Sequence, residues 1–131
     1  MLPNLHQEQL ISNIDNMEQQ YKKNIQWFSG FTIGLNKERD YFVENLSLLI
    51  SSGMSIVSAL DAIAEESRSR RMKNILAIMR EDIESGLPLW KALEASRLFP
   101  EHAVSLIRLG EASGNLIQNL KMVVVQQDKE R

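Results

Sequence analysis

Glu111 is the residue whose position most needs a chemical explanation, because it lies between two glycines in Gly110-Glu111-Ala112-Ser113-Gly114. The apolar spacing predicts the last turn of a helix before Gly114, where a left-handed stop is expected. The negative end of the helix dipole disfavours a carboxylate there by a few tenths to about 1 kcal/mol. Charge-assisted hydrogen bonds from the free N–H groups that open the next helix, or a neighbouring helix, would offset this cost.

Calcium binding is the second chemistry that Glu111 allows, since hard divalent cations prefer oxygen ligands. A single carboxylate supplies too few ligands, so such a site would need Asp61 or the acidic cluster at 81–84, and it would be shared across a dimer. We therefore keep Glu111 and Asp61 as candidate metal ligands beside the simpler expectation that no cofactor is bound.

A run of positive charges opens the helix predicted at 69–85, and the acidic cluster at 81–84 closes it. This order opposes the helix dipole, which favours acidic residues first and basic residues last. Pairing of the arginines with Glu65 and Glu66 would explain it. An acidic partner or an anionic membrane surface at this end of the protein would also explain it. The candidate partner-binding residues are Arg68, Arg70, Arg71 and Lys73.

Catalytic and metal-binding motifs are absent from the sequence. The chain has no cysteine, and its two histidines, His6 and His102, are too far apart in sequence to suggest a transition-metal site. Ser113 is one place away from a nucleophile elbow and follows no predicted strand, and no glycine-rich phosphate loop with a lysine exists. Nucleic-acid binding is disfavoured because the net charge is −2 and the basic run contains no aromatic residues. We predict a protein without enzymatic activity.

The elements that must position these residues are predicted to be helices. The chain has 131 residues, of which 44% are apolar and 24% charged, as in one ordinary globular domain. Pro88 and Pro100 fall where first helical positions are expected, and Gly53, Gly86 and Gly114 fall where helices should end. The apolar spacing predicts amphipathic helices at 37–52, 55–66, 69–85, 88–96, 100–113 and 115–128. Their short connections predict an all-α fold, a compact six-helix bundle of antiparallel helical hairpins within 37–131.

Residues 1–36 differ from the rest and are predicted to form an amphipathic helix, over 5–27, followed by a linker. The aromatic stretch 27–34 contains two glycines and breaks the helical pattern, so we expect it to latch onto the bundle or to contact another protein or lipid headgroups. The longest uncharged run, 45–60, is shorter than the roughly 20 residues that span a bilayer, and the chain is expected to be soluble. The apolar residues at three- and four-residue spacing are Leu10, Ile14, Met17, Tyr21 and Phe28.

An internal repeat aligns residues 52–62 with residues 85–95 at a spacing of 33. Both copies read S-G-(apolar)-x-(apolar)-x-x-A-L-(acid)-A, and a weaker third copy starts at Ser113, one residue out of step. Each copy predicts a helix stop, a tight turn and a helix with an Ala-Leu face for close packing. A spacing of this length also suits a generic helical-hairpin adaptor of the solenoid kind, which we keep as the alternative function.

Four motifs follow one another in order between residues 37 and 129. They are an aromatic-led helix ending at Gly53, a basic-led helix ending at Gly86 and followed by Ala92-Leu93, the turn Phe99-Pro100, and G-E-x-S-G-x-L at 110–116. Together they resemble the cytoplasmic domain of the secretion F-protein family, the inner-membrane platform proteins of type II secretion systems and type IV pili. The signature positions are Gly53, Gly86, Pro100, Gly110, Glu111 and Gly114.

The resemblance implies a non-enzymatic docking domain on the cytoplasmic side of the bacterial inner membrane. Platform proteins are thought to couple a cytoplasmic assembly ATPase to the extraction and polymerisation of pilin-like subunits. The implied partners are that ATPase, other inner-membrane assembly proteins of the same machine, pilin-like subunits, and further copies of the domain in a homodimer or higher oligomer. Members usually carry membrane helices, so the charged end at 128–131 is expected to lie just before the first of them.

Overall fold

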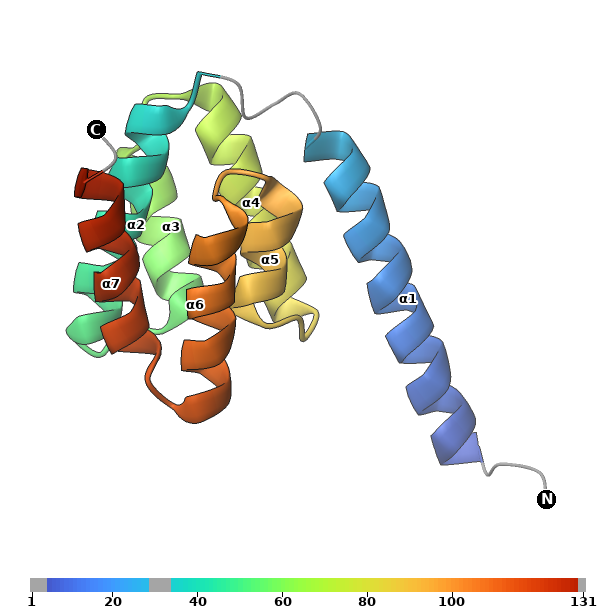
Figure 1. Cartoon of the computed structure of the whole chain (residues 1–131). Coiled ribbons are helices and arrows are strands. Elements are labelled where there is room, and N and C mark those ends of the chain that lie inside the picture. The colour runs from blue at the N-terminus through green and yellow to red at the C-terminus, as the bar shows by residue number, and fades with distance from the viewer. Residues whose placement is uncertain (1–4, 29–33, 130–131) are drawn as a thin grey trace.

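The computed structural model describes residues 5–28 and 34–129, with side chains for residues 5–19 and 34–129. Every regular element in these ranges is a helix, and the prediction of an all-α fold is confirmed (Figure 1). None of these helices combines the length and the apolar content that a membrane span requires. The helices are α1 (Leu5–Phe28), α2 (Asn36–Ser51), α3 (Ile56–Glu66), α4 (Arg70–Glu84), α5 (Leu89–Ser96), α6 (Glu101–Ser113) and α7 (Leu116–Lys129).

The predicted glycine stops are confirmed, since Gly53, Gly86 and Gly114 all have positive φ angles. At Gly114 the angle is +76°, a left-handed conformation that costs other residues about 1 kcal/mol or more. The N–H of Asn115 then turns back to the carbonyl oxygen of Gly110 at 2.9 Å, which satisfies one of the last free carbonyls of α6. The stops explain why α2–α7 begin and end within one residue of the predicted limits.

The predicted position of the two internal prolines is wrong by one residue. Pro88 and Pro100 are the caps that precede α5 and α6, with ψ angles of 158° and 161°, rather than the first helical residues. The ring fixes only φ, which suits both positions, so ψ decides between them. The consequence is chemical, because a proline cap has no side-chain oxygen with which to bind the free N–H groups of its helix.

Helices α2–α7 share one apolar core, to which α1 contributes no buried residue among its described side chains. Consecutive helices pack as antiparallel neighbours, and α7 returns to pack against α2 (Figure 1). The chain therefore closes on itself, whereas a solenoid repeat contacts only its neighbours. The rings of Phe42 and Phe99 lie 6.0 Å apart in this core. The helices contribute, in order, Phe42, Leu60, Met79, Leu89, Ile107 and Leu120, all fully buried.

Helix α1 lies against α4 and α5 and extends beyond them (Figure 1). Its observed limits agree with the predicted helix to within one residue. Met17 meets the turn between α4 and α5, where a Cβ atom at Gly86 would lie 3.7 Å from the Met17 methyl group. Nearer the N-terminus, Leu10, Ile11 and Ile14 are about half exposed. Most of the aromatic stretch 27–34, for which a latch or a partner contact is expected, lies outside the described residues.

Arg97 is the one residue other than glycine with a positive φ angle, 58°, in the described ranges. It ends α5 and its side chain is exposed. Because this conformation is strained for a residue with a Cβ atom, we expect Arg97→Gly to raise the free energy of unfolding by about 0.5–1 kcal/mol. The increase should appear as a melting temperature a few degrees higher.

The matched control is Ser52→Gly, which places glycine at the exposed end of α2, where φ is −80°. There glycine relieves no strain, increases the flexibility of the unfolded chain and removes the exposed hydrogen bond from Ser52 Oγ to the carbonyl oxygen of Leu49, so stability should fall. An Arg97→Gly protein that is no more stable than wild type would show that the left-handed turn costs nothing.

Candidate functional site

The carboxylate of Glu111 caps the first turn of α5. Its Oε2 atom accepts a hydrogen bond from the backbone N–H of Leu89 at 2.9 Å, and its Oε1 atom accepts one from that of Trp90 at 2.6 Å. These two N–H groups have no carbonyl partner within α5, and Pro88 has no side-chain oxygen that could accept hydrogen bonds from them. The expectation that Glu111 caps a helix is confirmed, and the helix is the neighbouring α5 rather than α7, which follows it in sequence.

The internal repeat shows why α5 needs a cap from elsewhere. In the first copy Ser55 caps its own helix, α3, by accepting a hydrogen bond from the N–H of Ser58 at 3.2 Å. Pro88 takes the place of Ser55 in the second copy, and Glu111 supplies the missing acceptor from α6. The third copy is out of step in the structure as well, because α7 begins two residues after Gly114 whereas α3 begins three residues after Gly53.

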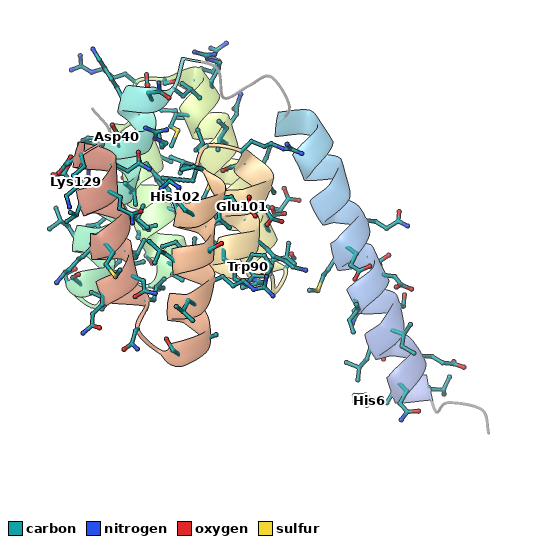
Figure 2. The ribbon with its side chains drawn as sticks, viewed as in Figure 1. His6, Asp40, Trp90, Glu101, His102 and Lys129 are labelled. Carbon is teal, nitrogen blue, oxygen red and sulfur yellow. The ribbon has the colours of Figure 1, made fainter. Side chains whose placement is uncertain are left out.

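A second contact from α6 reinforces the cap. The guanidinium carbon of Arg108 lies 4.5 Å from the centre of the Trp90 ring, a cation–π arrangement. Arg108 and Glu111 are three residues apart on α6 and so share one face of the helix. Sequence reasoning did not single out Arg108; its spacing from Glu111 is the signal that could have identified it. Figure 2 shows Trp90 on α5 and Glu101 on α6, two residues that line the cleft beside this contact.

Gly110 allows α6 and α7 to approach closely. A Cβ atom at this position would lie 2.9 Å from the Cβ atom of Asn119 and 3.1 Å from the Cα atom of Leu116, closer than real side chains tolerate. Asn119 itself donates a hydrogen bond from Nδ2 to the carbonyl oxygen of Leu106 at 2.7 Å. The signature at 110–116 therefore holds α5, α6 and α7 together. Gly110 lets α7 pack closely against α6, Glu111 caps α5, and Gly114 forms the turn that ends α6.

The acidic residues considered as calcium ligands have protein partners. Asp61 forms an ion pair with Arg80, with 2.6 Å between Oδ1 and Nε, and Arg80 also pairs with Glu84 at 3.1 Å. No group of three or more histidine, cysteine or acidic side chains gathers at metal-binding distance in the described ranges. Figure 2 shows His6 near the free end of α1 and His102 on the bundle, well apart. Calcium binding remains a prediction that a titration can test.

The four basic candidates lie together on the surface at the start of α4, and all four are exposed. Ser69 caps this helix by accepting a hydrogen bond from the N–H of Met72 at 3.2 Å. The expected pairing with Glu65 and Glu66 does not occur: within the described part of the chain, no ion pair joins either residue to an arginine. Arg68 and Arg70 form no ion pair with any residue that the structure describes.

Comparison with known proteins identifies one family. The profile of the family described as type II secretion system (T2SS), protein F, matches residues 42–131, more than half of the chain. The chain is 30% identical over 80 residues to a type IV pilus assembly protein PilC of Thermus thermophilus. This alignment covers 61% of the chain and 20% of that protein. The chain is 32% identical over 89 residues to a type II secretion system protein F of Pseudomonas aeruginosa, with 68% of this chain and 22% of that protein covered. The chain thus spans about a fifth of the length of these relatives.

Removing one acceptor oxygen from Glu111 tests the cap. We expect Glu111→Gln to lower the free energy of unfolding by about 1–2 kcal/mol, because the amide keeps one oxygen and turns an NH2 group toward the second N–H. Urea unfolding measures the loss. The control is Glu44→Gln, which removes the same charge from an exposed site on α2 with no ion pair among the described residues. Equal effects of the two changes would contradict the capping role.

Adding one methyl group at Gly110 tests the close approach of α6 and α7. We expect Gly110→Ala to lower the free energy of unfolding by about 1–3 kcal/mol, the usual cost of overfilling a packed site. In an open helix the same change would stabilise by up to about 1 kcal/mol. The sign of the change in melting temperature therefore distinguishes close packing from an open helix surface. A rise would show that α6 and α7 are not in tight contact at Gly110.

Proposed function

The chain belongs to the family of type II secretion system protein F, and we propose that it serves as the docking domain of a platform protein in the bacterial inner membrane. In this proposal the domain lies on the cytoplasmic side and contributes no catalytic group. It connects a cytoplasmic assembly ATPase to the inner-membrane assembly proteins and pilin-like subunits of a pilus or secretion machine. The names of the two relatives, one in pilus assembly and one in type II secretion, support this setting.

The observation that carries the proposal is the exposed positive charge of Arg68 and Arg70 at the start of α4. Arg68 and Arg70 are exposed and form no ion pair within the described residues, although the whole chain has a net charge of −2. They lie at the positive end of a helix dipole, where basic residues are unfavourable. This arrangement does not stabilise the isolated domain, whereas it would attract a negatively charged partner and accelerate association.

The packing of the domain suits a docking role. Helices α2–α7 form one closed core, and the signature residues fix α5, α6 and α7 through hydrogen bonds and close packing. A rigid scaffold presents a surface to a partner without a large cost in ordering. The basic end of α4 is remote from these fixed contacts, so we expect that its side chains can be exchanged while the fold is kept.

Charge reversal at the start of α4 tests the proposal. We expect Arg68→Glu/Arg70→Glu to keep or slightly raise the melting temperature, since acidic residues favour the start of a helix by a few tenths of a kcal/mol each. Binding to the assembly ATPase encoded with this protein should weaken, mainly through slower association. Surface plasmon resonance at several salt concentrations measures the association rate, and its salt dependence should decrease in the variant.

The matched control, Lys121→Glu/Lys129→Glu, makes the same change in charge on α7, where both lysines are exposed. Unaltered association with the ATPase after reversal at α4, or equal weakening by the control, would contradict docking through the basic end. An α4 variant that fails to fold would show instead that the arginines stabilise the domain.

A further inference from the structure

A groove of about 280 Å³ lies beside the basic residues, where the first turn of α2, the last turn of α3 and the first turn of α4 meet. The side chains of Ile63 and Met72 in its wall are buried, and Tyr41 stands at its edge with about half of its surface exposed. Small-molecule sites usually measure roughly 300–1,000 Å³, so this groove better fits one or two side chains than a cofactor. The groove is lined by Lys37, Glu38, Tyr41, Ile63, Glu66, Ser67, Arg68, Ser69 and Met72.

Positive charge exceeds negative charge around this groove. In the wall itself two basic side chains are balanced by two carboxylates. The excess comes from three exposed basic side chains in the adjoining first turn of α4, against one further exposed carboxylate near the end of α3. Arg39 and Asp40, on α2, neutralise each other at 3.2 Å. The charged side chains around the groove are Lys37, Arg68, Arg70, Arg71 and Lys73 against Glu38, Glu65 and Glu66.

The backbone adds to the positive potential. At the groove itself α2 and α4 begin and α3 ends. At the same end of the bundle α6 also begins, and α5 and α7 also end (Figure 1). Leu35, the residue that caps α2, has no side-chain oxygen and therefore gives the first N–H groups of that helix no side-chain hydrogen bond. Although the whole chain has a net charge of −2, exposed basic side chains and the starts of two helices lie beside this apolar groove.

We infer that this groove binds an acidic segment of a partner protein that carries an apolar anchor. The apolar side chain enters between Tyr41, Ile63 and Met72, and carboxylates on either side of it meet Arg68 and Lys37. The inference deepens the proposed docking role by naming the chemistry of the partner's segment. Glu38 and Glu66 accept hydrogen bonds from backbone N–H groups of such a segment, whereas they would repel the phosphates of an anionic membrane.

Peptide arrays provide the first test. Overlapping peptides of about 15 residues from the assembly ATPase and the other proteins encoded with this chain are probed with the purified protein. We expect the bound peptides to contain an apolar residue flanked by acidic ones. Binding of basic or neutral peptides only, or of none, would overturn the inference. Vesicles of phosphatidylglycerol and phosphatidylethanolamine form a parallel arm, and binding to vesicles without binding to acidic peptides would also overturn it.

Variants then locate the binding site of the strongest peptide. We expect Tyr41→Ala and Arg68→Glu each to weaken its binding by roughly five- to tenfold in fluorescence anisotropy. Leu48→Ala, a change at a more exposed position two turns further along α2, should leave it unaltered. Both α2 positions are on the surface, so folding is preserved and circular dichroism verifies this. If Tyr41→Ala and Arg68→Glu bind the peptide with the same affinity as Leu48→Ala, the inference is overturned.

The groove and the docking role can fail separately. Suppose that charge reversal at α4 weakens binding to the ATPase, but Tyr41→Ala leaves the affinity for the peptide unchanged. The assignment of the groove is then wrong, and the docking role stands. If the peptide depends on Tyr41 and Arg68 but the ATPase binds the charge-reversed protein normally, the groove is a binding site and the ATPase is not docked through it.

Discussion

The fold depends on two hydrogen bonds from the backbone of α5 to the carboxylate of Glu111. Helix α5 has only eight residues and begins after a proline that cannot cap it, so it would not be stable alone. Its first turn is held by Glu111, which lies in the last turn of α6. That helix ends at Gly114, three residues later. Helix α7 can pack against α6 only because Gly110 has no side chain. One short motif therefore couples three helices.

The basic groove lies at the opposite end of the bundle from this motif. In Figure 1 the turn between α6 and α7 and the start of α5 lie at one end, whereas α2 and α4 begin at the other. Antiparallel packing produces this separation, because alternate helices start at alternate ends. The contacts of the motif at 110–116 and the exposed positive charges at the start of α4 are thereby kept apart.

Local features of the fold were predictable from the sequence. Apolar periodicity, together with glycine at the helix ends, placed α2–α7 to within one residue. The prolines were misplaced by one position, because a fixed φ suits both the cap and the first helical residue. Pairing of Glu65 and Glu66 with the arginines was a fair hypothesis from proximity in sequence. Among the residues that the structure describes, no such ion pair forms, since an exposed ion pair gains little free energy over hydration of the separate charges.

The sequence by itself determined which residues form helices, which face of each helix is apolar and which glycines end them, because these properties depend on neighbours within a few residues. It also indicated that Glu111 needs hydrogen-bond donors. Only the tertiary structure decided that the donors are Leu89 and Trp90, about twenty residues away, and that Lys37, Tyr41 and Arg68 border one groove. Periodicity shows that a face is buried but not which helix covers it. That choice is made by the packing of all the helices at once.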